Sequence, residues 1–305
     1  MLSINNLAIS FHRFTRGFTR ETISPVSDVS FSVQAGEIVA LVGASGAGKS
    51  LLAHALLGLL PKNAQMSGDF CFKGEKISPA RIRELRGQEI ALIPQSISHL
   101  NPLTRVRKQV YRSARLSGRC HCTASESCDN AFVRYQLADT IKSMLPFQIS
   151  GGMARRVLTA TATAGKADLI IADEPTTGLD PKIIEQSLGH LQELSAQQKG
   201  VLLITHDLEN AVRVADTIVV LYGGTTVEIM PTTSTKPLHP YTRALWQALP
   251  QNGFISLPPV MKDKMHQAGC VFASRCPMAA LDCSNSLPPL NQVGATMVRC
   301  MHVTG

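Results

Sequence analysis

The sequence has no apolar run long enough to cross a bilayer. Its longest apolar runs lie at 38–43, 51–60 and 201–204, whereas a membrane-spanning helix needs roughly 20 residues. The first ten residues carry neither a basic start nor a cleavable apolar core, so they do not look like a signal peptide. We therefore expect the protein to stay in the cytosol and to act on a membrane only through partners.

Aromatic side chains are scarce, at 5% of the 305 residues, and 22 acidic residues face 30 basic ones, for a formal charge of +8. The basic excess is dispersed apart from one cluster: Arg105, Arg107, Lys108, Arg112, Arg115 and Arg119. Because few aromatic residues are interleaved with this cluster, it lacks the stacking platform that single-stranded nucleic acid requires. A solvated or lipid-headgroup-facing surface is the favoured interpretation, nucleic acid is the alternative, and we expect no direct nucleic-acid partner.

Repeats and low-complexity tracts are also missing, and apolar strand-like runs alternate with helix-like segments instead. This order predicts an α/β fold with a parallel core sheet. A Thr/Pro-rich stretch at 231–240 marks the end of that domain, and a Pro-rich tail with four cysteines follows. The predicted strands are 29–33, 38–42, 90–94, 169–172, 201–204 and 217–221, and the predicted helical segments are 50–60, 105–149, 154–163, 184–191 and 208–215.

A glycine-rich loop lies between a predicted strand and a predicted helix, as the phosphate-loop pattern G-x-x-x-x-G-K-[ST] demands. Its glycines let backbone N–H groups surround phosphate oxygens, and the helix N-terminus adds a partial positive charge. The lysine can reach the terminal phosphates and the serine hydroxyl can ligate Mg²⁺. A plain glycine-rich turn is the alternative. The loop consists of Gly43, Ala44, Ser45, Gly46, Ala47, Gly48, Lys49 and Ser50.

Two acidic residues, Asp173 and Glu174, end an apolar strand. Ligands bind at the carboxyl ends of parallel strands, so this position predicts that both acids lie beside the phosphate loop. Asp173 suits Mg²⁺, and Glu174 suits the polarisation of an attacking water. Acids that merely end a strand are the alternative.

Ser150, Gly151 and Gly152 begin a predicted helix and form a second candidate anion site. Because the chain already has one phosphate loop, this second site is most simply explained as serving the nucleotide of another subunit. A simple N-capped helix is the alternative.

With these motifs, the chain resembles the ABC ATPases over residues 1–232. Residues 43–50 match the Walker A loop, 170–174 the Walker B strand, Gln95 the Q-loop, 149–153 the signature, 178–180 the D-loop and His206 the switch histidine. The resemblance implies that two such domains meet head to tail around ATP. It assigns Glu174, His206 and Gln95 to catalysis, Ser50, Gln95 and Asp173 to Mg²⁺, and Ser150, Gly151, Gly152 and Asp180 to nucleotide contacts.

The chain departs from that family at two places, and one position is left open. Met153 replaces the usual glutamine of the signature, and Arg155 lies where the family often has glutamine. The aromatic residue that stacks on adenine is left open among Phe11, Phe14 and Phe18.

Four tail cysteines, Cys270, Cys276, Cys283 and Cys300, lack the paired C-x-x-C spacing of a zinc ribbon. The spacing alone leaves a metal site and free thiols equally open. The segments 238–245, 269–272, 275–277 and 100–102 resemble those of dipeptide, oligopeptide and nickel importer ATPases. That resemblance implies cysteines able to hold a 4Fe-4S cluster, with Zn²⁺ as the other metal.

We expect an ABC-type P-loop core with an antiparallel β subdomain and a helical signature subdomain, followed by a small Cys-rich extension. The expected domains are 1–232, with a helical part at about 96–155, and 233–305. The expected function is ATP hydrolysis that energises import of peptides or nickel chelates at the cytoplasmic face of the membrane. Expected partners are a homologous ATPase in a heterodimer, two permease subunits and an external binding protein. A non-transport ABC ATPase acting on nucleic acid or ribosomes, and an exporter ATPase, are the alternatives.

Overall fold

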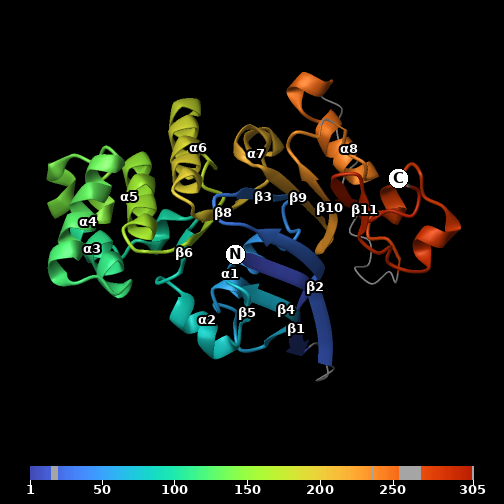
Figure 1. The fold of residues 1–305 in the computed structure, drawn as a ribbon, viewed down its shortest axis with the longest axis horizontal. Helices are drawn as coiled ribbons and strands as arrows, with labels where there is room; N and C mark the ends of the chain where they lie inside the picture. The colour runs from blue at the N-terminus through green and yellow to red at the C-terminus, as the bar shows by residue number, and fades with distance from the viewer. Residues whose placement is uncertain (15–19, 235, 254–268, 304–305) are drawn as a thin grey trace.

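The computed structural model describes all residues except 15–19, 235, 254–268 and 304–305. Its strands form one mixed sheet whose described order is β5-β4-β1-β2-β10-β9-β3-β8-β7-β6, with β11 and β12 beside β10 (Figure 1). Helices cover both faces of this sheet, and helical segments also lie beyond its two ends (Figure 1). The protein therefore has a mixed α/β fold.

The parallel half of the sheet is built from short, largely apolar strands. Neighbours pair in parallel from β6 through β7, β8 and β3 to β9. Continuous runs of Val, Ile and Leu are typical of strands that are buried on both faces. The predicted strands in this half are confirmed: they are β3 (Ile38–Gly43), β6 (Ile90–Ile93), β7 (Leu169–Asp173), β8 (Gly200–Thr205) and β9 (Thr217–Tyr222).

The antiparallel half faces the parallel half across helix α1 (Lys49–Leu56). The strand predicted at 29–33 is only the end of β2, which begins at Arg20. Polar residues interrupt the apolar pattern before Val29, and the strand forms there because it pairs with β1. The strands of this half are β1 (Leu2–Phe14), β2 (Arg20–Val33), β4 (Ala64–Phe72) and β5 (Glu75–Lys76), and helix α2 (Pro79–Leu85) follows β5. Strand β10 (Thr225–Pro231) lies between β2 and β9 in the strand order and is antiparallel to β9.

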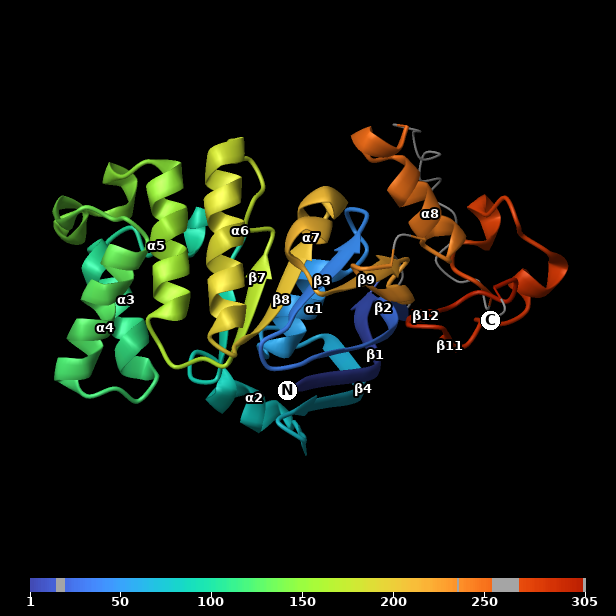
Figure 2. The same cartoon turned by 45° about the horizontal axis from the view of Figure 1, so that its top comes forward.

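A helical lobe projects from the β6 end of the sheet (Figures 1 and 2). It has its own apolar core around Phe132 and Tyr135. The segment predicted as helical at 105–149 is two helices followed by 3-10 turns, because Gly118 adopts φ 79° between them. The last helix of the lobe begins three residues before the predicted start, since Ser150 caps it, and it continues to Thr163. The lobe comprises α3 (Val106–Leu116), α4 (His121–Arg134) and α5 (Gly151–Thr163).

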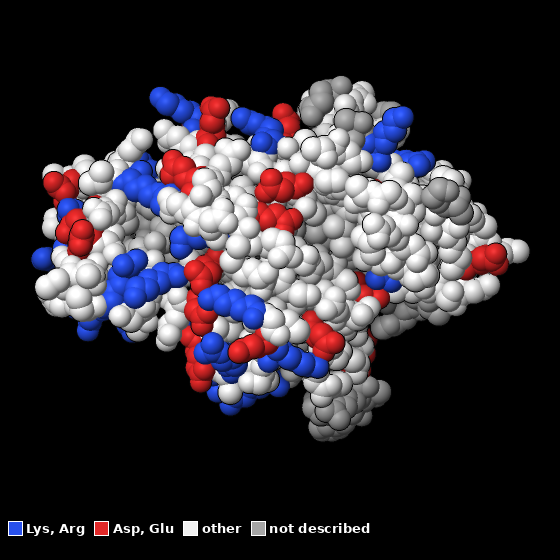
Figure 3. Space-filling view, viewed as in Figure 1, with Lys and Arg blue, Asp and Glu red and all other residues white. Residues whose placement is uncertain are grey.

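The basic cluster of the sequence lies largely on α3, and part of it is paired. Arg107 and Lys142 both form ion pairs with Asp129, at 3.1 and 2.9 Å. Figure 3 shows Lys and Arg mixed with Asp and Glu over this side of the molecule, whereas the C-terminal side of the same face is largely uncharged.

The other face of the parallel sheet carries α6 (Pro181–Ala196), α7 (Leu208–Val214) and α8 (Pro240–Gln247). The chain then returns to the sheet, where β12 (Thr296–Val298) pairs with both β10 and β11 (Asn291–Val293). The C-terminal region is therefore hydrogen-bonded into the main sheet. No helix among the described residues is long and apolar enough to cross a membrane.

Candidate nucleotide-binding site

A hollow of about 530 Å³ opens at the carboxyl ends of the parallel strands. It gathers side chains from five separate stretches of sequence. Four of them were expected at a nucleotide site, and the fifth, Pro25 in β2, was not predicted. The hollow is lined by Pro25, Ser45, Gly46, Gly48, Lys49, Ser50, Leu51, Gln95, Glu174 and His206.

The predicted phosphate loop connects β3 to α1, and its backbone conformation depends on glycine. Gly48 adopts φ 92°, and a Cβ there would lie 2.8 Å from Val26 Cγ2 and 3.0 Å from the Pro25 carbonyl oxygen. Any other residue would therefore be strained and would clash. Because Gly48 is the N-cap of α1, the positive end of that helix points into the hollow.

Lys49 is 6% exposed, and its Nζ donates to two carbonyl oxygens of the same loop, Gly43 at 2.8 Å and Ala44 at 3.1 Å. Burial lowers the pKa of Lys49, and the nearby carboxylates of Glu174 and Asp173 act in the opposite direction. A negatively charged phosphate oxygen in the hollow would stabilise the charged form of this ammonium group and so oppose the effect of burial on its pKa.

Asp173 ends β7 beside the start of α1, where its Oδ1 accepts a hydrogen bond from Ser50 Oγ at 3.1 Å. Burial raises the pKa of Asp173 despite this bond. A hydroxyl and a carboxylate side by side are the oxygen ligands that Mg²⁺ prefers, so the pair fits the expected metal.

Glu174 follows β7 in a left-handed conformation, with φ 49°, and is 7% exposed. Its Oε2 accepts a hydrogen bond from Thr177 Oγ1 at 2.9 Å and lies 2.7 Å from His206 Nδ1. The left-handed backbone of Glu174 and these two side-chain partners fix the carboxylate at the edge of the hollow. Thr177 was not predicted as a site residue, and only its spacing of three residues from Glu174 could have indicated this contact.

Ser150 caps α5 by accepting a hydrogen bond from the Met153 amide at 3.3 Å, and it is exposed together with Gly151. Asp180, also exposed, caps α6 through the Ile183 amide at 3.1 Å. Within the described chain, the hollow is lined by none of the four residues Ser150, Gly151, Gly152 and Asp180. A single molecule thus keeps its signature loop apart from its own phosphate loop.

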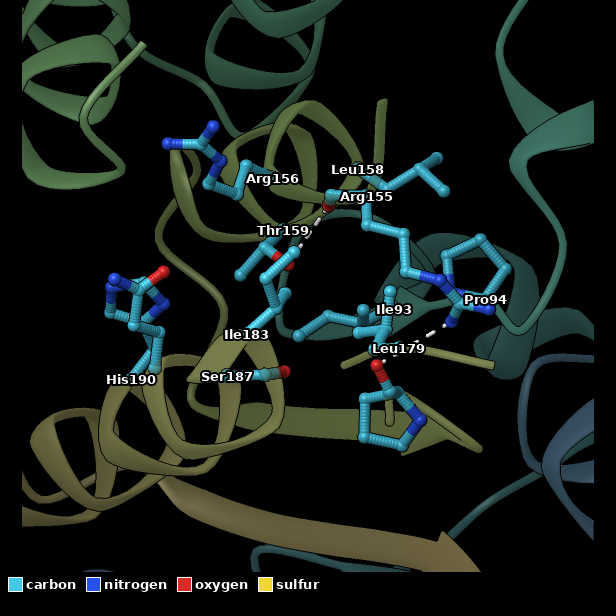
Figure 4. A pocket seen from close by; sticks show the side chains of 12 residues that line it. Ile93, Pro94, Arg155, Arg156, Leu158, Thr159, Leu179, Ile183, Ser187 and His190 are labelled. Carbon is cyan, nitrogen blue, oxygen red and sulfur yellow. Dashed lines mark hydrogen bonds between the residues drawn. The ribbon is translucent and has the colours of Figure 1, made fainter. Parts of the chain in front are cut away.

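A second, smaller cavity separates the signature helix from the turn after Glu174 (Figure 4). Arg155 lies in its wall and donates from Nη2 to the Thr177 carbonyl oxygen at 2.8 Å and from Nη1 to that of Glu174 at 3.3 Å. The residue that departs from the family pattern therefore ties α5 to the backbone of the predicted catalytic turn.

Of the three aromatic candidates for adenine stacking, only Phe11 has its side chain among the described residues. Phe11 is half-buried and packs against the core between the two halves of the sheet. Phe18 and the side chain of Phe14 lie outside the described residues.

The four tail cysteines occupy one small lobe next to α8. The Cys270 amide donates to the Cys283 carbonyl oxygen at 2.7 Å, and Cys283 Sγ lies 3.2 Å from His302 Nε2. Burial raises the pKa of Cys270, and so do the neighbouring thiols of Cys283, Cys300 and Cys276. The sulfur donors suit a soft metal or cluster, but nowhere in the described chain do three or more His, Cys, Asp or Glu side chains form a group that could hold a metal ion.

Comparison with known proteins agrees with this geometry. Residues 26–177 match the ABC transporter family, and residues 227–283 match the oligopeptide/dipeptide transporter C-terminal region. The oligopeptide transport ATP-binding protein OppD of Salmonella typhimurium is 33% identical, over 95% of this chain and 90% of that protein. The dipeptide transport ATP-binding protein DppD of Escherichia coli is 34% identical, over 96% of this chain and 93% of that protein.

Solved structures share the fold. A dimeric structure of MJ0796, described as a bacterial ABC transporter cassette, matches 76% of this chain and 99% of its own, with a TM-score of 0.66 and 24% identity. A post-hydrolysis structure of the same cassette with ADP and Pi gives a TM-score of 0.67 at 24% identity and the same coverage. Together with the full-length relatives, these matches show that the chain belongs to the ABC transporter ATP-binding subunits of the oligopeptide/dipeptide transporter family.

Proposed function

We propose that this chain binds Mg·ATP in the 530 Å³ hollow and that its hydrolysis energises the import of peptides. The observation that carries the proposal is the convergence of Lys49, Ser50, Gln95, Glu174 and His206 on one hollow at the carboxyl edge of the sheet. The named relatives serve oligopeptide and dipeptide transport, which favours a peptide cargo over nickel.

The loop residues Gly43, Ala44, Ser45, Gly46, Ala47 and Gly48 would surround the phosphates, and Lys49 would neutralise the terminal ones. Ser50 and Asp173, with Gln95 at the rim of the hollow, would hold Mg²⁺, which supplies charge neutralisation on the phosphates. Binding in this arrangement depends on fixed amides and charges that need little rearrangement when ATP arrives.

Glu174 would orient and polarise the attacking water, and His206 would position both the water and the terminal phosphate. The 2.7 Å contact between the two side chains supports a shared task, because one carboxylate oxygen faces the imidazole at the mouth of the hollow. Thr177 would keep the same carboxylate in place.

Ser150, Gly151, Gly152 and Asp180 would complete the site from the opposite molecule. The exposure of Ser150, Gly151 and Asp180 in the single chain, and the dimeric form of the MJ0796 cassette, support this division. The companion would be a homologous ATPase in a heterodimer. The pair would dock on two permease subunits at the cytoplasmic face of the membrane, with an external protein delivering the peptide.

The domain division follows the same logic. Residues 1–232 would form the ATPase domain, with the helical signature part at about 96–155 and the antiparallel strands as a second part. Residues 233–305 would form the extension. A 4Fe-4S cluster or Zn²⁺ would bind to Cys270, Cys276, Cys283 and Cys300 only after these side chains rearrange, because they do not form a metal-binding group in the described chain. Iron, sulfide and zinc analysis of anaerobically purified protein tests this, and a metal-free, fully folded sample would contradict it.

Purification of the chain from membranes tests the proposed function. We expect two integral membrane proteins and a homologous ATPase to copurify, and ATP hydrolysis to rise when the binding protein is added with peptide. Copurification of ribosomes or nucleic acid without membrane proteins would favour the non-transport alternative instead.

A further inference from the structure

The phosphate loop is hydrogen-bonded to a residue almost two hundred positions away in the sequence. The Ala44 amide, near the start of the loop, donates to the hydroxyl oxygen of Tyr241 at 3.2 Å. Tyr241 is 2% exposed and is the second residue of α8, in the C-terminal region. The bond therefore joins the phosphate loop to the C-terminal region, and no sequence motif indicated this contact.

Tyr241 itself is held rigidly. Its ring packs against those of Tyr222, at 4.5 Å between centroids, and Phe272, at 5.5 Å, and these two rings also contact each other. Its backbone amide donates to His239 Nδ1 at 3.1 Å, so the histidine caps α8. The start of α8 is anchored in turn to β10, where fully buried Glu228 accepts hydrogen bonds from the amides of residues 238 and 239, at 2.7 and 3.1 Å.

We propose that Tyr241 is a positioning residue for the phosphate loop: its hydroxyl fixes the Ala44 amide so that the loop is already ordered when ATP arrives. This deepens, and rests on, the proposed function of the 43–50 loop. A loop that is fixed before binding loses less conformational freedom on binding, and its ligand affinity is correspondingly higher. The Tyr241 hydroxyl is paired with the Ala44 amide and Tyr241 is not among the residues that line the hollow, so it would act through the loop.

The same contact makes the C-terminal region part of the support of the nucleotide site. Phe272 lies between Cys270 and Cys276 in the sequence, and it packs on both Tyr222 and Tyr241. The hydroxyl reaches the loop only while this region is docked on the sheet. A high affinity for ATP therefore requires an intact C-terminal region, although that region contributes no residue to the lining of the hollow within the described chain.

Replacement of one hydroxyl tests the proposal in the assembled transporter. In Tyr241→Phe we expect KM for ATP to rise about three- to tenfold, the typical value of one hydrogen bond, while kcat stays within about twofold. A change in KM at constant kcat reports lost binding in ground and transition state alike, which is the effect of a loop that must be ordered by its ligand. Burial raises the pKa of Tyr241 to about 12, so the KM ratio between wild type and variant should be constant from pH 7 to 9.

Tyr222→Phe is the matched control, because it removes a hydroxyl from the same aromatic cluster. That hydroxyl accepts a hydrogen bond from Arg275 Nη1 at 3.1 Å and does not bond to the loop. We expect KM of this variant to stay within about twofold of wild type. Equal KM increases in both variants, an unchanged KM in folded Tyr241→Phe, or a fall in kcat at constant KM would each overturn the proposal.

A measurement on the wild-type protein covers the case in which Tyr241→Phe does not fold. Amide hydrogen exchange in the absence of nucleotide should show the Ala44 amide protected, and fast exchange there would contradict the proposal. Lys49→Ala separates this test from the proposed function. If that variant loses ATP binding while Tyr241→Phe is silent, only the positioning role fails, whereas normal ATP binding by Lys49→Ala refutes the site itself.

Discussion

The phosphate loop and the tip of the signature helix would bind the same phosphate chain, yet the protein builds them in opposite ways. On the loop side, Lys49 and Glu174 are 6% and 7% exposed, and both are hydrogen-bonded to other groups of the chain. On the signature side, Ser150 and Gly151 are exposed at the end of a helix. The loop side is thus an organised half-site, and the signature side is a surface that a second molecule must complete.

The largest effect should come from the loop side, at Glu174. Glu174→Gln removes the proposed general base but keeps the size of the side chain and its acceptor oxygen for Thr177. Since a positioned base contributes about 100- to 10,000-fold, hydrolysis should fall by at least about 100-fold while ATP binding is retained. The measurement is single-turnover hydrolysis with radiolabelled ATP. Exposed Glu209→Gln, on α7, is the control, and unchanged turnover in Glu174→Gln would refute the assignment.

Lys49→Ala should affect binding itself. Because a hydrogen bond between charged groups contributes strongly to the binding free energy, its loss should weaken ATP affinity by about 100-fold. Equilibrium binding of ATP to the purified protein measures this effect. Lys62→Ala, at an exposed position before β4, should bind ATP normally, and a similar loss in both variants would mean that Lys49 has no special role.

A charge at the signature tip should sharpen the contrast between the two sides. Ser150→Glu places a negative group where the phosphate of the companion's ATP would lie, so hydrolysis by the assembled pair should fall by about tenfold or more. ATP affinity of the isolated chain should not change. Ser78→Glu is a matched control, because Ser78 is also an exposed serine that caps a helix, α2. A weaker ATP affinity in isolated Ser150→Glu would break the proposed division into half-sites.

The last effect concerns the stability of the support of the loop side, not hydrolysis, and depends on pH. Burial, followed by the charge of Arg243, lowers the pKa of His239 to about 4. An unfolded histidine titrates near 6.5, so between these values the unfolded chain binds more protons and the folded state loses stability as the pH falls. From pH 7 to 5 this loss is about 2 kcal/mol for the one group.

His239→Asn should remove that loss, because asparagine can cap α8 in the same way without titrating. Urea unfolding at pH 7 and pH 5 measures the difference. His121→Asn, at an exposed position on α4 in the signature-bearing lobe, is the control and should retain the wild-type pH dependence. An equally steep dependence in His239→Asn and wild type would show that the anchor of α8 does not sense pH.

The parallel sheet and the motifs of the loop side could be predicted from sequence because their signals are local. Continuous apolar runs define β3, β7 and β8, and glycine is required at Gly48 by the backbone itself. The first half of β2 was missed because its residues are held by pairing with β1 across the sheet. Tyr241 and Thr177 carry no motif, and their roles arise only when folding brings distant segments together.

The most direct test of the central claim is whether ATP brings two half-sites together. We would measure association of Glu174→Gln with its homologous ATPase by analytical ultracentrifugation, with and without Mg·ATP. We expect a stable pair only with nucleotide, and no such pair when Ser150→Glu is added to the same chain. An association that is independent of ATP, or absent under both conditions, would contradict the account.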